Sequence, residues 1–489
     1  MMLLLSLLLP GVWASGQQET IPWEGMEGEI NLLLERYQAV GLSVAVVKGE
    51  DVLYSVGFGH RDSDRKLPVT ANTVFPIGSI TKSFTGTLLG IAESEQRLSL
   101  KDKPALYLPQ FQFYNDNMND LIAIEDLLSH RSGIGNQGTS EVFFPNDDKL
   151  TVVQRLRYLP PQDEVKNSFS YSNMGYTLAG AVLEQCSKQS WEQNLEERLI
   201  GPLQMSNTFT SLDKTKATEN FALGYGIHQG AVEKTAYQRF YSQAPAGAIK
   251  SSVNDLSHWM IAWLNQGQFA GRQVIPEAYI RKATSLQNVK EESYEKDSFL
   301  NGEGFGWRLR ASYGHFRVGH GGNTTGFSSI TYLFPFEKLG IVVLCNQDNS
   351  YLPYMVADLI VRKMLGQAPM AEYPVVVNDL YRPDPESSGY NEAKMPTHAP
   401  EAFVGAYEAE GYGSIEVVEE GEALFAVFPT YRLRLEHRHY NQFYLEGTKD
   451  FDNTFDPGFA VEFVVDREGK IEALEIHSQR EPVVFERRE

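Results

Sequence analysis

A chain of 489 residues with a formal net charge of −20 is too long for one compact core, so two or three domains are expected. Its apolar content of 42% and charged content of 22% are typical of a soluble globular protein. The acidic balance argues against nucleic acid or an anionic membrane as a partner, because both attract basic surfaces. No glycine-rich string follows a nucleotide-binding pattern, so no cofactor is expected.

The first 16 residues form an uncharged apolar run followed by small residues. This run resembles a secretory signal peptide cleaved near Ala14 or Gly16, although the basic segment that usually opens one is missing. No later segment is long and apolar enough to cross a membrane. The expected location is therefore secreted or periplasmic. Two cysteines are too few for a disulfide framework, and no Cys/His cluster has zinc-site spacing, so no metal is expected.

The chain up to residue 365 has the pattern of a sheet with a helical insertion. Between residues 100 and 300 the apolar spacing is mostly helical, with long polar loops. Around this middle lie a predicted helix over 24–38, a hairpin over 42–57, a second hairpin over 329–344 and a closing helix over 354–365. The order indicates an α/β fold in which one antiparallel sheet carries a helical subdomain.

The C-terminal part of the chain has a different pattern. Residues 366–400 contain six prolines and little periodicity, which marks a linker. Six short β-runs follow between residues 414 and 476, as in a small antiparallel barrel or sandwich. The expected division is a leader over 1–16, a main domain over 17–365, the linker, and a β-domain over 401–489.

The string from Phe75 to Lys82 opens a segment with helical spacing of its apolar residues. A serine and a lysine three positions apart on one helix face form a nucleophile–base pair that needs no histidine. At the start of the helix, Ser79 would lie near free backbone N–H groups, which favour a developing oxyanion. This spacing alone is weak evidence, because a capping serine and a solvated lysine produce it too.

Two further strings make the pattern specific. Tyr171-Ser172-Asn173 begins 92 residues after Ser79, and His320-Gly321-Gly322 begins 149 residues after Tyr171. With Ser79 and Lys82, these strings resemble the Ser-x-x-Lys, Tyr-x-Asn and Lys/His-x-Gly motifs of the serine β-lactamase and penicillin-binding-protein family. The class C and esterase-like branch is the most similar, over roughly residues 25–365. The resemblance implies that family's fold and a hydrolase that works through an acyl-enzyme.

The resemblance also implies a role for each motif residue. Ser79 would attack a carbonyl carbon and form the acyl-enzyme. Lys82 would take the serine proton, which requires a lowered lysine pKa. Tyr171 is the second candidate base, passing a proton to the leaving group and then activating water. Asn173 would hydrogen-bond Lys82 and the acyl side chain.

The third motif is expected to bind the substrate. Gly321 and Gly322 would let a substrate approach the backbone closely. The family resemblance places the oxyanion hole at the backbone N–H groups of Ser79 and Asn323. His320 stands where β-lactamases usually carry lysine, and histidine is neutral for much of the time near pH 7. The variant argues against true β-lactamase activity and resembles the family's esterases and D-aminopeptidases.

The C-terminal β-domain resembles the lipocalin-like extension of some of these hydrolases. It could shape the cleft entrance, hold protomers of a homo-oligomer together, bind a ligand, or only add stability. The expected function is a secreted serine hydrolase that cleaves peptide, amide or ester bonds in a small molecule or peptide. The alternatives are a β-lactamase or D-alanyl-D-alanine carboxypeptidase, and a penicillin-sensing or ligand-binding protein without turnover.

Overall fold

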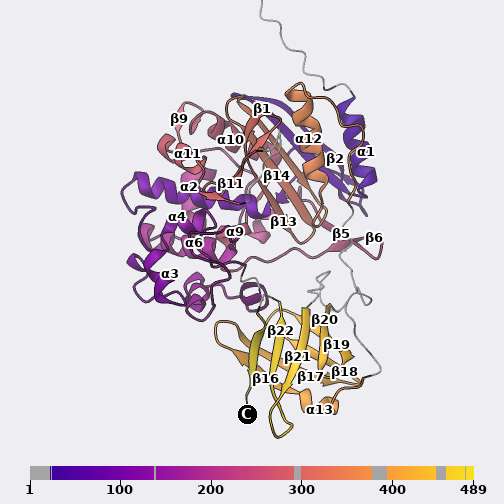
Figure 1. The fold of residues 1–489 in the computed structure, drawn as a ribbon. Coiled ribbons are helices and arrows are strands. Elements are labelled where there is room, and N and C mark those ends of the chain that lie inside the picture. The colour runs from indigo at the N-terminus through magenta and orange to yellow at the C-terminus, as the bar shows by residue number, and fades with distance from the viewer. Residues whose placement is uncertain are drawn as a thin grey trace, which may run out of the picture.

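The structure is a computed structural model. It describes residues 23, 25–136, 139–290, 299–376, 394–447, 459–478 and 481–488. The expected leader over 1–16 and much of the expected linker lie outside the described residues. Figure 1 shows two bodies, an α/β domain and, below it, a β-barrel in yellow.

A nine-stranded antiparallel sheet organises the α/β domain, which confirms the predicted fold class. Strand β1, from the first hairpin of the chain, lies inside this sheet because it pairs with β15, the last strand of the domain. In this pair Leu42 lies opposite Cys345. In spatial order the strands are β10 (Asn288–Val289), β11 (Asn301–Glu303), β12 (Arg308–Ser312), β13 (His315–Thr324), β14 (Phe327–Phe334), β15 (Leu339–Cys345), β1 (Gly41–Lys48), β2 (Asp51–Asp62) and β3 (Leu67–Pro68).

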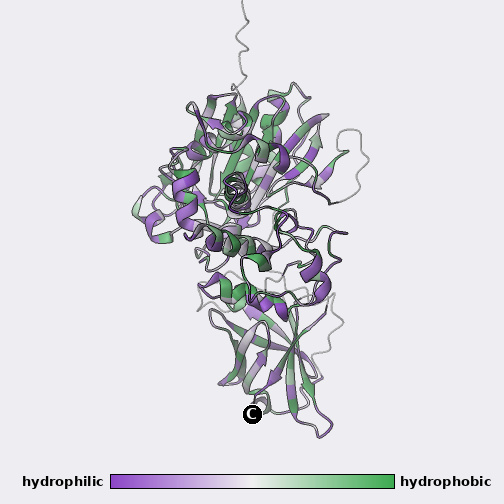
Figure 2. Ribbon diagram, turned by 90° about the vertical axis from the view of Figure 1, so that its left-hand side faces the viewer, coloured by the Kyte–Doolittle hydropathy of each residue, from purple (hydrophilic) through white to green (hydrophobic). Residues whose placement is uncertain are grey.

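Both faces of the sheet are covered, so its central strands are apolar on both sides. Val44 and Val46 pack in a core with α1 (Met26–Arg36) and α12 (Leu352–Met364). The intervening Ala45 and Val47 belong to the core that contains α10 (Val253–Leu264). Figure 2 shows hydrophobic stretches in green on strands and helices of this domain. Side chains therefore alternate between two cores, as period-two strands require.

The predicted helical middle is confirmed, and it lies against the α10 side of the sheet (Figure 1). Its helices are α2 (Thr81–Ser94), α3 (Asp116–Leu121), α4 (Ile124–Leu128), α5 (Lys149–Val153), α6 (Asn173–Ser187), α7 (Trp191–Leu195), α8 (Leu212–Ala217), α9 (Ala244–Gly247) and α11 (Glu277–Ala283). Three strand pairs join them: β4 (Phe75–Pro76) with β7 (Lys250–Ser251), β5 (Gly224–His228) with β6 (Ala231–Thr235), and β8 (Gln268–Phe269) with β9 (Arg272–Gln273). In the described part of the chain, no helix has the length and hydrophobicity needed to cross a bilayer.

The C-terminal part is a closed antiparallel barrel of eight strands, preceded by α13 (Pro400–Phe403). Six of these strands contain the predicted β-runs. The first and last strands of the barrel in sequence were not predicted, and their pairing closes the barrel. The strands are β16 (Gly405–Ala409), β17 (Gly413–Glu420), β18 (Ala423–Val427), β19 (Arg432–His439), β20 (Gln442–Gly447), β21 (Phe459–Val465), β22 (Ile471–His477) and β23 (Val483–Arg487). Pairing of β16 with β23 leaves no free sheet edge.

Candidate active site

Ser79 lies in a 3-10 turn, η1 (Gly78–Ile80), that leads directly into α2. Gly78 has a φ of +51°, and a Cβ on it would lie 2.8 Å from the backbone nitrogen of Asn323. Only glycine suits this position, both for its backbone angle and for the closeness of β13. The turn thus places the backbone of Asn323 beside the nucleophile. Ser79 itself is partly exposed, so a substrate can reach it.

Lys82 is completely buried one turn after Ser79. Its Nζ donates hydrogen bonds to Ser79 Oγ at 3.0 Å, to Asn173 Oδ1 at 2.7 Å and to the carbonyl of Ala246 at 3.0 Å. Burial is the main cause that lowers the pKa of Lys82, to about 7. A substantial fraction of the amine is therefore neutral near pH 7 and able to accept the serine proton.

Tyr171 contacts the nucleophile from the other side. Its hydroxyl donates to Ser79 Oγ at 2.8 Å, and its ring centroid lies 4.8 Å from Lys82 Nζ. Burial raises the pKa of Tyr171 to about 12, so the resting side chain is a neutral phenol. Of the two predicted bases, the buried lysine is therefore the one suited to take the serine proton directly.

His130 supports the Tyr171 motif and is absent from the predicted site residues. Its Nδ1 accepts a hydrogen bond of 3.1 Å from the backbone N–H of Ser172, and its ring centroid lies 4.3 Å from that of Tyr171. Burial, with the charge of Lys82, holds the pKa of His130 well below its usual range, so the imidazole is neutral. A signal for this residue lies in the string from Leu127 to Gly133, which is also similar to sequences of the family named above.

Strand β13 carries the third motif along the other wall of the site. His320 is buried, and its Nδ1 lies 2.6 Å from the carbonyl oxygen of Gly321. A Cβ on Gly321 would meet the Tyr354 hydroxyl at 2.1 Å, and one on Gly322 would meet the Ile77 carbonyl at 1.9 Å. These two glycines are therefore required by packing within the protein, in addition to the predicted approach of a substrate.

Three arginines beside His320 were not predicted. Arg308, Arg310 and Arg317 line a cavity of about 100 Å³ together with His320. Arg310 and Arg317 are register partners on β12 and β13, and the Arg317 guanidinium lies 4.2 Å from the ring centroid of Tyr332. Burial, with the charges of Arg308 and Lys82, holds the pKa of His320 well below its usual range. The positive charge that a neutral His320 lacks is therefore supplied by its neighbours.

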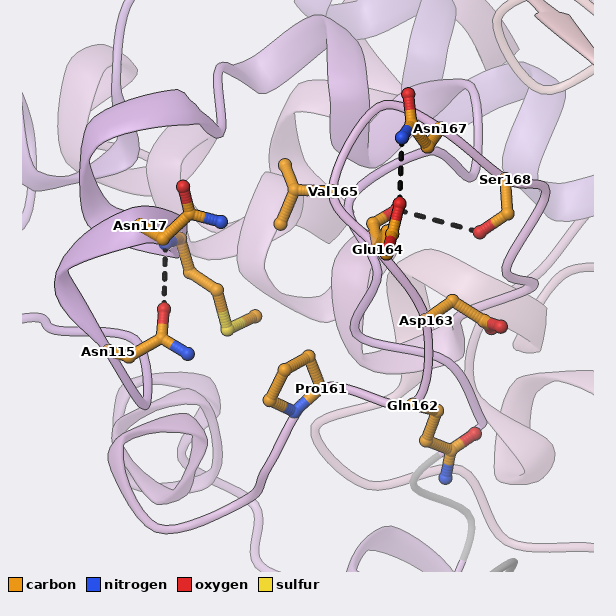
Figure 3. A pocket seen from close by; sticks show the side chains of 10 residues that line it. Asn115, Asn117, Pro161, Gln162, Asp163, Glu164, Val165, Asn167 and Ser168 are labelled. Carbon is orange, nitrogen blue, oxygen red and sulfur yellow. Dashed lines mark hydrogen bonds between the residues drawn. The ribbon is translucent and has the colours of Figure 1, made fainter.

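A larger depression, of about 910 Å³, lies on the helical part of the domain (Figure 3). Its lining is mostly amide and carboxyl, including Asp163 and Glu164, so its character is opposite to that of the arginine cavity. The Oγ of Ser170 donates to Asp163 Oδ2 at 2.6 Å. This bond ties the loop that forms the depression to the residue just before Tyr171.

Among the described residues, one group of three side chains has ligand atoms close enough to hold a metal ion. Glu462, Glu475 and His477 place these atoms within 4.8 Å of one another. They lie on β21 and β22 of the barrel and are at least partly exposed. None of the three belongs to the Ser79 site.

Comparisons with known proteins agree with this geometry. Residues 26–362 match the profile of the family described as Beta-lactamase. The chain belongs to the β-lactamase family. Residues 391–487 match a Domain of unknown function (DUF3471), which covers the barrel, so its likeness to lipocalins stays a prediction.

Two curated relatives of this β-lactamase-family chain illustrate the range of the similarity. Protein flp of Staphylococcus aureus (strain MW2) is 29% identical over 334 residues, which are 67% of this chain and 63% of the relative. The chain therefore spans less than two thirds of the length of that relative. Unguisins hydrolase ungD of Aspergillus violaceofuscus is 25% identical over 447 residues, 82% of this chain and 77% of the relative.

Solved structures share the fold over nearly the whole chain. The octameric penicillin-binding protein homologue from Pyrococcus abyssi has a TM-score of 0.63 at 22% identity, covering 94% of this chain and 99% of its own. SurE has a TM-score of 0.57 at 20% identity, covering 95% of this chain and 98% of its own. Both likenesses therefore extend across the α/β domain and the barrel.

Proposed function

We propose that this β-lactamase-family protein is a serine hydrolase that cleaves peptide, amide or ester bonds through an acyl-Ser79 intermediate. One observation carries the proposal: Ser79 Oγ lies 3.0 Å from the Nζ of a fully buried lysine whose pKa is about 7. A neutral amine at that distance can remove the hydroxyl proton as the oxygen attacks. The kinship with a hydrolase of unguisins supports the reaction class.

Each side chain then has one task. Ser79 Oγ bonds to the carbonyl carbon while its proton passes to Lys82 Nζ, and the carbonyl oxygen takes up negative charge. The backbone N–H groups of Ser79 and Asn323 stabilise that oxygen, a contribution of about 2.7–4 kcal/mol per donor at comparable sites. Tyr171 relays the proton to the leaving group, and Asn173 fixes the lysine. Water then releases the acyl group by the reverse proton path.

A second candidate function concerns substrates that carry a carboxylate, as β-lactams and D-alanyl-D-alanine peptides do. The arginine cavity beside His320 favours it, because guanidinium groups bind carboxylates strongly. A binding protein that acylates without turnover is less well supported, since Lys82 and Tyr171 both contact the nucleophile. The proposal also includes export of the protein by a leader over 1–16 and assembly into a homo-oligomer. It divides the chain into a main domain over 17–365 and a β-domain over 401–489.

The test is turnover of a nitrophenyl butyrate ester, a D-amino-acid anilide and a penicillin by the native protein and by Ser79→Ala. Loss of ester or anilide turnover and of covalent labelling by an acylating probe in the variant would support the proposal. Turnover that survives in Ser79→Ala would overturn it. Rapid penicillin hydrolysis by the native protein would favour the second candidate.

A further inference from the structure

One short segment of the α/β domain, residues 139–144, is held by the barrel. It begins with the π-helix η3 (Thr139–Phe143). The Phe143 ring centroid lies 4.7 Å from that of Phe428, and the Phe144 ring centroid lies 5.8 Å from that of Phe485. Both phenylalanines are 2% exposed. The two rings therefore complete the apolar core of the barrel from outside it.

Polar contacts fix the backbone of the same segment. Ser140 Oγ donates to the carbonyl of Gly411, in the barrel, at 2.7 Å. From the α/β side, Arg155 Nη1 donates to the carbonyls of Ser140 and Phe144 at 2.9 and 2.7 Å. The segment is thus bound at both of its ends and cannot shift without breaking contacts to the barrel.

Between these anchors, Glu141 belongs to the buried surroundings of the active site. It is 4% exposed, and its Oε1 accepts a hydrogen bond of 3.1 Å from Thr177 Oγ1. Thr177 lies one turn after Asn173 on α6, and Asn173 is one of the residues that accept a hydrogen bond from Lys82. The second carboxyl oxygen, Oε2, is buried and has no hydrogen-bond partner in the described part of the chain. A buried carboxyl that is only half satisfied is costly to stability, and such groups are concentrated at functional sites.

The charged groups around this carboxyl are few. Burial raises the pKa of Glu141 to about 7, while the charges of Lys82, on α2, and of Arg155, in the turn after α5, favour its ionised form. Arg239 lines the same cavity of about 240 Å³, between the barrel and the α/β domain, that Glu141 lines. Around Lys82, Glu141 favours the ammonium form while Arg308 disfavours it, and His130 and His320 are neutral neighbours.

We propose that Glu141 is a positioning residue for Lys82, stabilising the ammonium formed there during acylation, and that the barrel holds it in place through Phe143 and Phe144. The inference rests on the proposed function. No bond to Glu141 forms or breaks: the proton leaves Ser79 Oγ, arrives at Lys82 Nζ, and meets a carboxylate in its surroundings. The barrel is then part of the catalytic apparatus, acting through six residues of the neighbouring domain.

The first experiment is the pH dependence of kcat/KM for a nitrophenyl ester, using the full chain and its Glu141→Gln variant. In the native protein the rate is expected to fall below about pH 7, where Lys82 becomes protonated. Removing the carboxylate lowers the lysine pKa, so the acid limb moves down to about pH 6 while the plateau falls about tenfold. The Glu141→Asp variant keeps the carboxylate, so its acid limb and its plateau rate should both lie close to those of the native protein. An acid limb that stays in place in Glu141→Gln would overturn the proposal.

The second experiment tests the barrel with a matched pair of variants. Phe143→Ala and Phe463→Ala each remove one phenyl ring from the barrel core, but only Phe143 lies on the segment that carries Glu141. The acid limb is expected to move in Phe143→Ala and to stay in Phe463→Ala. If the acid limb of kcat/KM lies at the same pH in the two variants, the proposed role of the barrel is wrong. Turnover that persists in Ser79→Ala would instead show that the proposed function itself is wrong.

Discussion

The two bodies of the molecule differ in what they bury. In the α/β domain several ionisable side chains are buried, among them Lys82, His130, His320 and Glu303. In the described part of the barrel the buried side chains are apolar apart from Asn441, while its charged residues remain at the surface. Burying ionisable groups costs free energy. The α/β domain buries such groups at its candidate active site, whereas the barrel has the apolar core of an ordinary stable domain.

Among the variants that test this difference between the two bodies, Tyr171→Phe in the α/β domain should have the largest effect on kcat/KM. Loss of the hydroxyl that contacts Ser79 Oγ should lower kcat/KM by about 10²- to 10⁴-fold, because a proton relay is removed. Tyr176→Phe is the matched control, since that buried hydroxyl donates to the Leu128 carbonyl instead. Steady-state kinetics and thermal unfolding of both variants check this. Equal rate losses in the two variants would contradict a special role for Tyr171.

In the barrel, Phe463→Ala should act on stability alone. The ring packs against Phe403, Tyr407 and Phe443, and removing it should cost about 3–5 kcal/mol of unfolding free energy. Folded protein should retain native kcat/KM. Urea unfolding followed by fluorescence gives the first quantity, and assays normalised to folded protein give the second. A change in kcat/KM larger than about twofold would break the contrast between the two bodies.

Substrate charge is expected to have a smaller effect. Arg317→Gln should raise KM for a carboxylate-bearing ester by about tenfold, since one guanidinium leaves the cavity beside His320. The methyl ester of the same substrate is the matched control and should keep its KM. In the reverse direction, His320→Lys should improve KM for the carboxylate form. If KM changes equally for the acid and for its methyl ester, the cavity does not recognise the carboxylate charge of the substrate.

The smallest expected change in stability is a gain from Lys82→Met, a variant that should also lose turnover completely. The pKa of Lys82 is about 7 when folded and close to 10.4 when unfolded, so between these values the unfolded chain binds the extra proton. The lysine therefore destabilises the fold most below pH 7, and the penalty disappears as pH rises above 10. Lys82→Met should raise the unfolding free energy by about 0.5–2 kcal/mol at pH 7 and by less at pH 10. A variant less stable at both values would contradict this.

Motif residues and strands were predictable from the sequence, whereas contacts between distant segments were not. The three family strings led to Ser79, Lys82, Tyr171 and Asn173, which hydrogen bonds join in the fold, and to His320 on β13. Short β-runs predicted most barrel strands but could not distinguish a barrel from a sandwich, because closure depends on pairing β16 with β23.

Two missed features show where the limit lies. The arginine cavity had a local signal, since Arg308 and Arg310 are two apart on one strand and point to the same face. Adding Arg317 required the register between β12 and β13. Glu141 had no local signal at all. Its place near Lys82 depends on a π-helix and on two phenylalanines that enter another domain.

The pairing of β1 with β15 has a consequence for synthesis of the protein. Strand β1 cannot pair with β15 until Cys345, about 300 residues after its partner Leu42, has been synthesised. At about 5–20 residues per second a ribosome needs roughly 15–60 s for that stretch. During this time the apolar edge of β1 is open to wrong partners, and chaperone protection of the nascent chain would matter most then. Apart from the closing pair of β16 and β23, the barrel pairs strands that are neighbours in sequence, so it can form soon after it is made.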